Sequence, residues 1–326
     1  MRGLLHNRIT SFTWFAVFTW FGSVVLPAPM PGHWTGEGFA ASLQPELADS
    51  GIVGPAYGEI EAELKTLADF HTSTAELVTY GASVEGRNLR GIKIKLPAGR
   101  LISPTPPAHP PGPRPAVVIT GSTHGNEYLN IEDRLPRWIL ENQNTSPGLA
   151  KFLKGGGVIF IIPILNPDGY DRRMRTNAHD VDLNRDFDLL PANESNFKEP
   201  ESRAVANWLD REIEEDNLEL KISVDYHCCA DSLLFPWSYT EDSLPQGLLL
   251  AHEIVARAMQ RFIDPNYTFG STGQVLGYTP RGTSKDYYFA RYNALSFTFE
   301  GQYGEENKKF AQHTLWWDYI LSTLVN

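Results

Sequence analysis

The chain has 326 residues, of which 42% are hydrophobic and 21% are charged, as is usual for globular proteins. Its formal net charge of −11 excludes the broad basic surface that nucleic-acid binding needs, so we expect no nucleic-acid partner. The length allows either one large domain or two smaller ones.

The first forty residues differ in composition from the remainder. Arg2 and Arg8 precede an uncharged apolar stretch, and small residues follow in the segment GFAAS at 38–42. A basic start, an apolar core and a small-residue exit are typical of a secretory signal peptide. The alternative is a retained membrane anchor, for which the 18 residues from Ile9 to Leu26 lie at the short limit of a bilayer span.

We therefore predict a signal peptide at residues 1–40 and a single mature domain at residues 41–326. The mature protein is expected in the periplasm or outside the cell, as a monomer. Contact with a membrane is expected only if the leader is retained.

Apolar periodicity predicts the first elements of the mature domain. Residues 56–70 carry apolar side chains at the spacing of one helix face, and residues 89–96 alternate as in a half-buried strand. The proline-rich segment 103–115 fits neither a helix nor a central strand. It is either an interdomain linker or, more simply, a surface loop between neighbouring strands.

The rest of the chain alternates predicted strands and helices. Continuous apolar runs at 116–120 and 157–164 suit central strands that are buried on both faces. Further strands are expected at 222–227 and 295–300, and helices at 128–142, 200–215, 248–262 and 313–325, with Pro136 kinking or breaking the first. This alternation predicts a single α/β domain whose mixed, mostly parallel central sheet carries helices on both faces.

The two cysteines, Cys228 and Cys229, are adjacent and so cannot join distant parts of the fold. We expect two buried thiols that pack as small hydrophobic groups. A strained vicinal disulfide is the alternative.

Potential metal ligands follow two of the predicted strands. His124 and Glu127 come after the strand at 116–120, and His227 ends the strand at 222–227. In open α/β sheets, active sites lie just beyond the strand ends. Two histidines and one carboxylate, with a fourth position left for water, form a recurring catalytic zinc set. The pattern therefore predicts one zinc ion per chain.

The sequence also supplies a base and cations for hydrolysis at such a metal. Glu300 ends the strand at 295–300, where partial burial would hold its pKa near the working range of a general base. The segment 166–188 contains four arginines, any of which could stabilise a developing oxyanion.

A series of motifs in the mature chain resembles the zinc carboxypeptidases of the carboxypeptidase A superfamily. Each motif alone occurs in many unrelated proteins, but the whole series in this order is specific to the family. The motifs are GASVEGR (81–87), HGNE (124–127), NPDGY (166–170), RTNA (175–178), DVDLNRDF (180–187), EPESRA (199–204), a histidine after a strand at 227, and SFTFEG (296–301).

The resemblance implies roles for residues around the metal. His124, Glu127 and His227 would be the zinc ligands, and Glu300 would act first as the general base and then as the acid. Asp182 matches the carboxylate that orients the first zinc histidine.

One arginine of the segment is expected to polarise the scissile carbonyl. Arg175 resembles the family's arginine in this role, with Arg172 and Arg173 as nearby alternatives.

The resemblance also implies substrate contacts. Asn184 and Arg185 match the pair that grips the free terminal carboxylate, with Arg185 as a bidentate clamp. Tyr278 precedes Glu300 at the spacing of the family's mobile tyrosine. Position 126 is asparagine where the digestive enzymes have arginine, so one carboxylate contact of that branch is absent.

Lys285 lies 15 residues before Glu300, the position that forms the floor of the side-chain pocket in the resembled family. A lysine there would pair with an acidic side chain, so we expect a preference for a C-terminal Glu or Asp, or for an acidic cell-wall peptide. The alternative is that Lys285 points to solvent from a mobile loop.

These expectations together describe an exported zinc metallocarboxypeptidase that acts on peptides with a free C-terminal carboxylate. A zinc amidase of the same fold, acting on murein peptides or N-acyl amino acids, would use the same metal set. A catalytically inactive binding module is a third possibility, although candidates for every catalytic group are present.

Overall fold

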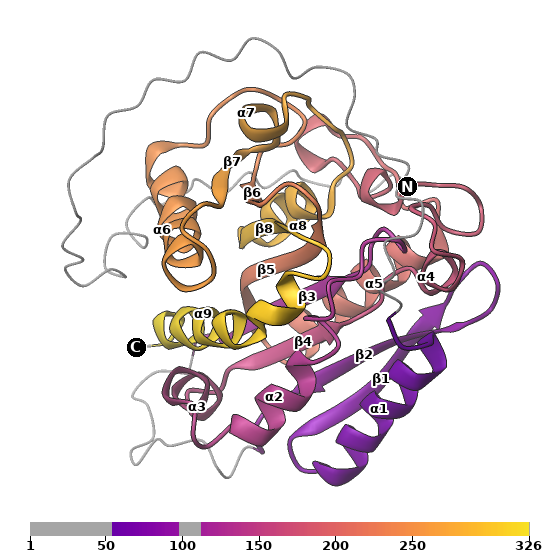
Figure 1. Cartoon of the computed structure of the whole chain (residues 1–326), viewed down its shortest axis with the longest axis vertical. Coiled ribbons are helices and arrows are strands. Elements are labelled where there is room, and N and C mark those ends of the chain that lie inside the picture. Colours follow the sequence, from indigo (N-terminus) through magenta and orange to yellow (C-terminus); the bar gives the residue numbers. More distant parts are fainter. Residues whose placement is uncertain (1–53, 98–111, 326) are drawn as a thin grey trace, which may run out of the picture. The chain divides into compact units, whose positions relative to one another are not determined.

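The computed structural model of the protein describes residues 54–97 and 112–325, all of which belong to one compact unit, residues 44–326 (Figure 1). The predicted leader lies outside the described residues. Within those residues, none of the helices combines the length and the apolar character that a bilayer crossing requires.

An eight-stranded mixed sheet forms the centre of the fold, in the order β1-β2-β4-β3-β5-β8-β6-β7. The pairs β4/β3, β3/β5, β5/β8 and β6/β7 are parallel, and the pairs β1/β2, β2/β4 and β8/β6 are antiparallel. The strands are β1 (Ala75–Ala82), β2 (Asn88–Ile94), β3 (Arg114–Gly121), β4 (Val158–Ile162), β5 (Leu218–Cys228), β6 (Ser232–Phe235), β7 (Thr268–Ser271) and β8 (Leu295–Gly301).

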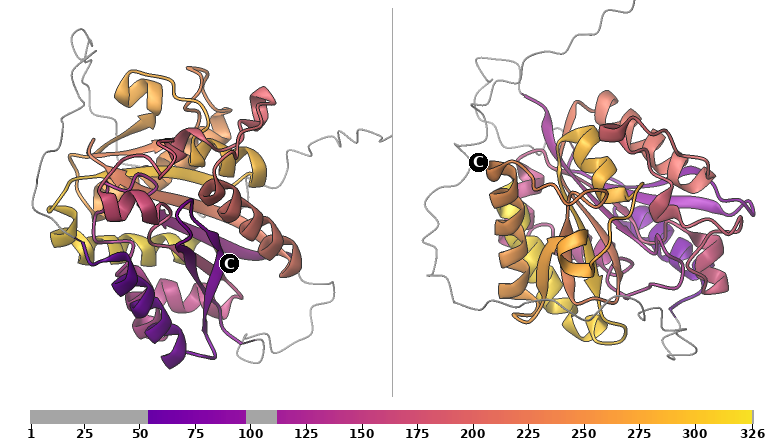
Figure 2. Two further views of the ribbon diagram at one scale, coloured as in Figure 1. Left: turned by 90° about the vertical axis from the view of Figure 1, so that its right-hand side faces the viewer. Right: turned by 90° about the horizontal axis from the view of Figure 1, so that it is seen from above.

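Helices cover both faces of this sheet (Figures 1 and 2). The helices are α1 (Tyr57–Phe70), α2 (Leu135–Asn142), α3 (Pro147–Lys154), α4 (Pro167–Arg172), α5 (Pro200–Glu215), α6 (Gln246–Phe262), α7 (Thr272–Leu276), α8 (Ser284–Tyr292) and α9 (Phe310–Thr323). Short 3-10 turns occur at η2 (Leu183–Arg185), η3 (Leu190–Ala192) and η4 (Glu306–Lys309). The single α/β domain with a mixed, mostly parallel sheet is thus confirmed.

Helices α5 and α8 pack on one face of the sheet. Trp208 of α5 stacks on Tyr80 with 5.1 Å between ring centroids and meets Phe160 edge-on at 5.5 Å. Tyr287 and Tyr288 of α8 belong to the same buried cluster. Because α5 is amphipathic, burial of this one apolar face stabilises it.

Helix α9 packs on the opposite face. Its Trp317 donates an indole hydrogen bond to the Tyr226 hydroxyl at 2.9 Å, and its Trp316 lies against Phe299. Alternate residues of β5 and β8 therefore face α9, and the residues between them face α8. This alternation decides which side chains reach the candidate site.

Three sequence predictions about local structure are corrected or refined. The helix predicted at 128–142 begins only at Leu135, because Pro136 fits the first turn of a helix and not its interior. Most of the proline-rich segment lies outside the described residues, but β2 and β3, which flank it, are not neighbours, since β4 lies between them. Cys228 and Cys229 form a vicinal disulfide and are not buried, so the prediction of two buried thiols was wrong.

Candidate metal centre

The candidate centre lies where three neighbouring parallel strands end. His124 and Glu127 follow β3, His227 lies near the end of β5, and Glu300 lies near the end of β8. Strands β3, β5 and β8 are adjacent in the sheet, and His227 is the direct cross-strand partner of Glu300. Residues that are distant in sequence are therefore brought together by strand pairing alone.

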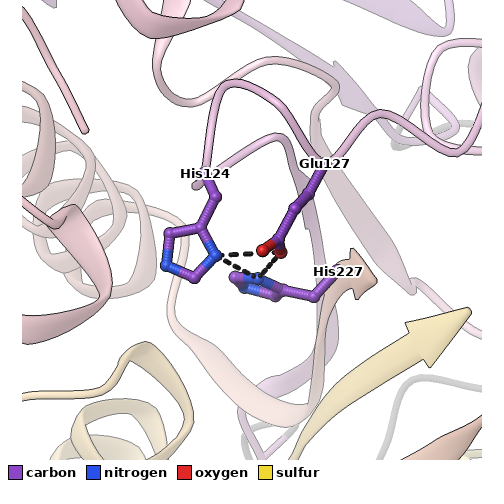
Figure 3. Close-up of side chains that lie close together, drawn as sticks. All are labelled: His124, Glu127 and His227. Atoms are coloured by element: carbon purple, nitrogen blue, oxygen red, sulfur yellow. Dashed lines mark hydrogen bonds and ion pairs between the residues drawn. The ribbon is translucent and has the colours of Figure 1, made fainter. Parts of the chain in front are cut away.

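Two imidazoles and one carboxylate converge at this point (Figure 3). The Nδ1 atom of His124 lies 2.9 Å from Oε2 of Glu127 and 3.0 Å from Nδ1 of His227. The same Glu127 oxygen lies 2.8 Å from Nδ1 of His227. The three side chains are buried.

A carboxylate stands behind each histidine. Nε2 of His124 lies 3.0 Å from Oδ1 of Asp182, and Nε2 of His227 lies 3.0 Å from Oδ2 of Asp225. These carboxylates favour a proton on both Nε2 atoms, which leaves the Nδ1 lone pairs directed at one another. Two facing lone pairs and a carboxylate oxygen suit a shared cation, and this donor set suits zinc. The residues present therefore fit the expected metal.

Close backbone packing holds the loop that carries His124 and Glu127. A Cβ atom added to Gly125 would lie 2.1 Å from the carbonyl carbon of Gly169 and 2.2 Å from the nitrogen of Tyr170, both in α4. Only glycine fits between the loop and α4 at this distance.

Arg175 is the arginine that reaches the centre. Its guanidinium lies 3.1 Å from Glu127 and 2.9 Å from Asp182. The alternatives lie elsewhere, because Arg172 is exposed and pairs with Glu85, and Arg173 is exposed at the end of α4. Burial acts to lower the pKa of Arg175, but Asp182 and Glu127 outweigh it and raise that pKa, so the side chain stays cationic.

The surroundings shift the pKa values of Glu300 and Glu127 in opposite directions. Burial raises the pKa of Glu300 to about 7, with Glu127 adding to the effect and His227 opposing it. Burial also acts to raise the pKa of Glu127, but the two histidines lower it below its ordinary value. One acid is thus suited to ligation and the other to proton transfer near neutral pH.

The predicted substrate-contact residues lie close to Asp182 and Arg175, the charged groups beside this centre. The Asn184 side-chain oxygen accepts a hydrogen bond from the Ser284 N–H at 3.0 Å, at the start of α8. Arg185 follows it in η2, with Nη1 2.7 Å from the carbonyl oxygen of Asn184. Tyr278 is 48% exposed, and its hydroxyl lies close enough to Arg175 to raise the pKa of that arginine.

Lys285 lies in the first turn of α8 and is only 2% exposed, so the solvent-facing alternative was wrong. Its ammonium donates to the hydroxyls of Ser238 and Thr272, the latter at 2.8 Å. Within the described residues it forms no ion pair with a carboxylate. Burial lowers its pKa, against the opposing effects of Asp286 and Glu300.

Asp225 is a site residue that the sequence reasoning missed. The pattern Asp-x-His inside a strand was a usable signal, because residues two apart in a strand share a face. The carboxylate accepts hydrogen bonds from three hydroxyl groups besides its contact with His227. The donors are Thr120 at 2.8 Å, Thr123 at 3.0 Å and Ser284 at 2.7 Å.

A family model described as zinc carboxypeptidase matches residues 60–316. Carboxypeptidase SOL1 of Arabidopsis thaliana is 27% identical over 282 residues, which cover 82% of this chain and 54% of that protein. The inactive metallocarboxypeptidase ECM14 of Ajellomyces dermatitidis is 26% identical over 244 residues, which cover 65% of this chain and 40% of that protein. The chain thus spans about half or less of the length of these curated relatives.

Solved structures share the fold. Thrombin activatable fibrinolysis inhibitor superposes with a TM-score of 0.67 at 22% identity, covering 82% of this chain and 73% of that one. Carboxypeptidase A from Helicoverpa armigera superposes with a TM-score of 0.63 at 21% identity, covering 82% of this chain and 72% of that one.

Proposed function

The chain belongs to the zinc carboxypeptidase family, and from this premise we propose that it is an active zinc metallocarboxypeptidase. It hydrolyses the C-terminal peptide bond of peptides that carry a free terminal carboxylate. The observation that supports the proposal most directly is the meeting of His124, Glu127 and His227 beside the strand partner Glu300.

Activity is a proposal because the matched relatives include proteins named as inactive. This chain retains a candidate for each group that hydrolysis needs. The three metal-ligand candidates converge, Arg175 contacts Glu127, and Glu300 is unpaired with any cation at hydrogen-bond distance among the described residues. An inactive binding module has no reason to keep all of these.

The residues would divide the chemistry as follows. Zinc, when bound by His124, Glu127 and His227, supplies Lewis acidity that lowers the pKa of a water molecule and polarises a carbonyl. Glu300, with its pKa raised to about 7, accepts the proton of the attacking water and passes it to the leaving amine. Arg175 stabilises the negative charge that develops on the scissile carbonyl oxygen.

Substrate selection follows from the cations on the α8 side of the centre. Arg185 and Asn184 hold the free terminal carboxylate, which restricts cleavage to chain ends. Tyr278, whose side chain is 48% exposed, closes over the bound residue.

We further propose a preference for an acidic C-terminal residue. Lys285 is a buried ammonium whose partners in the described residues are hydroxyl groups. A buried cation with no carboxylate at ion-pair distance among the described residues is costly, and a carboxylate from the substrate side chain would add a direct partner to the more distant charges of Asp286 and Glu300. An acidic residue would thus place its two carboxylates against two cations, Arg185 and Lys285.

Export is part of the proposal and is supported by the leader-like composition of residues 1–40. Those residues lie outside the described part of the chain, so export is tested by sequencing the N-terminus of the processed protein. The mature N-terminus of the protein secreted by its host should be found near residue 41. An intact N-terminus in the membrane fraction would support the retained anchor instead.

The central experiment is the variant Glu300→Gln. It keeps the ligand set, so zinc content should match that of the parent, while turnover of a C-terminal peptide bond should fall by at least about a thousandfold. Glu219→Gln, the same chemical change at an exposed position at the start of β5, should behave as the parent. Near-normal activity of Glu300→Gln would refute the assignment.

A peptide series separates the candidate functions. Peptides that differ only in a final Glu, Phe or Lys should be cleaved fastest with Glu, and blocking the terminal carboxylate as an amide should abolish cleavage. Equal rates would end the acidic preference. Hydrolysis confined to N-acyl amino acids or murein peptides would favour the amidase, and no hydrolysis of any substrate by the zinc-loaded protein would favour the inactive module.

A further inference from the structure

A chain of hydrogen bonds and one ion-pair contact, between Asp225 and His227, connects the outer nitrogens of the two candidate metal-ligand histidines. From His124, Nε2 contacts Asp182 Oδ1 at 3.0 Å, and the same oxygen accepts the N–H of Asn184 at 2.9 Å. The Asn184 side chain then accepts the N–H of Ser284 at 3.0 Å. The chain of contacts thus leads from the metal centre to the first residue of α8.

The second half of the chain returns from α8 to the metal centre. The Ser284 hydroxyl donates to Asp225 Oδ2 at 2.7 Å, and this oxygen lies 3.0 Å from Nε2 of His227. Since the Nδ1 atoms of the two histidines lie 3.0 Å apart, the contacts close into a ring. Ser284 contributes to both halves, through its N–H on one side and its hydroxyl on the other.

Asp225 is the most heavily used member of the ring. Its Oδ1 accepts from Thr120, its Oδ2 accepts from Ser284 and lies beside His227, and the Thr123 hydroxyl lies 3.0 Å from both oxygens. All of these side chains are buried. If one donor is lost, the Asp225 oxygen is therefore left without a hydrogen bond from water, which costs free energy. A carboxylate that accepts several hydrogen bonds in a fixed geometry has one orientation available to it.

We infer that Asp225 is a positioning residue that fixes the ring of His227 and couples it, through Ser284, to the start of α8. The same turn of α8 carries Lys285, and Asn184 lies one step further along the ring. A displacement at the substrate side is thereby transmitted to a metal ligand, and the reverse also holds. Neither Asp225 nor Ser284 ligates the metal or touches the reacting atoms.

The inference rests on the proposed zinc role of His227, but its test does not depend on turnover. The dissociation constant of zinc alone is measured by competition with a chromophoric chelator on the folded, full-length mature protein. If the unmodified protein binds zinc but cleaves no substrate, the proposed function is refuted. The inference about Asp225 is still tested by the zinc dissociation constants of the variants.

Asp225→Asn is the main variant. An amide offers one acceptor oxygen where the carboxylate offers two, so it cannot serve both pairs of donors. Zinc binding should weaken about ten- to a hundredfold, the usual effect of losing a partner behind a metal histidine. Ser223→Ala is the matched control, because Ser223 lies two residues earlier on the same buried face and bonds Ser296 instead. It should bind zinc as the parent does.

The coupling through Ser284 is tested by combining variants. Ser284→Ala removes only the hydroxyl and should weaken zinc binding several-fold, by loosening Asp225. Because Ser284 acts on the metal through Asp225, the double variant should bind zinc no more weakly than Asp225→Asn alone. Parent-like zinc binding by Asp225→Asn, or independent effects that multiply in the double variant, would overturn the inference.

A second route applies if Asp225→Asn does not fold. Thr123→Ala and Ser284→Ala each remove one donor from Asp225 and leave its charge in place. Both should weaken zinc binding by about threefold or more, since the carboxylate loses its fixed orientation. Zinc binding equal to that of the parent in both variants overturns the inference in the same way.

Discussion

Under the proposed function, single side chains decide which substrate is preferred, and Lys285 is the clearest case. It is a fully enclosed cation whose partners in the described residues are hydroxyl groups. Such a group costs stability, and under the proposed acidic preference a substrate carboxylate would pair with it. Stability therefore favours an uncharged residue at position 285, whereas the proposed acidic preference requires the lysine.

The variant Lys285→Met, of similar length and without charge, tests both demands. The kcat/KM for a peptide ending in Glu should fall about a hundredfold, since a charge-assisted hydrogen bond is worth about 2–3 kcal/mol, while a Phe-ended peptide should be unaffected or improved. The free energy of unfolding should not decrease. Lys154→Met, at the exposed C-terminal end of α3, is the control. A parallel loss on both peptides would contradict the assignment.

Gly125 offers a second test at this scale. The variant Gly125→Ala would push the loop away from α4, because its new methyl group overlaps backbone atoms of Gly169 and Tyr170. We expect a loss of about 1–3 kcal/mol in the free energy of unfolding, together with weaker zinc binding as His124 is displaced.

Gly58→Ala is the matched control for that variant. A Cβ atom at Gly58, in α1, meets no other atom within 4 Å. Because alanine favours a helix more than glycine, this variant should be up to about 1 kcal/mol more stable than the parent in denaturant titrations. Equal behaviour of the two alanine variants would show that the loop tolerates the added group.

Secondary-structure elements are tied together by ion pairs at the edge of the sheet away from the metal. At the C-terminal end of α5, Asp216 lies 2.8 Å from Lys93 of β2 and 2.9 Å from Lys95. Partial burial acts to raise the pKa of Asp216, but the two lysines outweigh it and lower that pKa from 3.8 to about 2. The carboxylate is therefore more strongly ionised in the folded protein than in the unfolded chain.

The variant Asp216→Asn should make this contribution measurable. An acid whose pKa is lowered by folding stabilises the protein above its unfolded pKa, and the effect is lost as the pH falls from about 4 to about 2. At neutral pH the variant should lose about 1 kcal/mol, a value that allows for screening at a side chain that is 26% exposed. Denaturant titrations of both proteins should converge near pH 2, and a constant difference would exclude the ion pairs as its cause.

Elements with strong periodicity were predictable from the sequence, and others were not. The helix at 200–215 and the strand at 295–300 match α5 and β8 almost residue for residue, because their apolar spacing agrees with their burial. Helix α8 was not predicted, and a loop there was considered only as the alternative for Lys285, because the first turn of α8 buries the polar residues Ser284, Lys285 and Asp286. Its buried aromatic residues, Tyr287 and Tyr288, follow this polar turn, so the apolar spacing of a helix face is interrupted at its start.

At the scale of the whole molecule, the order of the strands could not be read from the sequence. Periodicity identifies a strand but does not say which strand it pairs with, so the insertion of β4 between β2 and β3 was unforeseen. The candidate metal ligands were predictable because they match family motifs and follow predicted strands. Asp225 and the ring through Ser284 depend on pairings of β3, β5 and α8, which only the structure supplies.

Metal removal should leave the fold intact. The ligands project from paired strands and from a loop packed on α4, so the metal is not needed to assemble the sheet. Zinc at a thousand times its dissociation constant should add about 4 kcal/mol of stability. In a protein of this size that corresponds to a Tm about 10 °C higher than after chelation. Calorimetry with and without a chelator checks this, and complete unfolding on chelation would contradict it.

The strands that bear the site all deliver their functional groups at one end of the sheet, while β2 ends and β3 begins at the opposite end. The connection between those strands can thus be lengthened without altering the spacing of any group that meets the substrate. An epitope or fluorescent reporter spliced into it should yield a labelled enzyme with unchanged kinetics, which makes this connection the natural place to attach cargo.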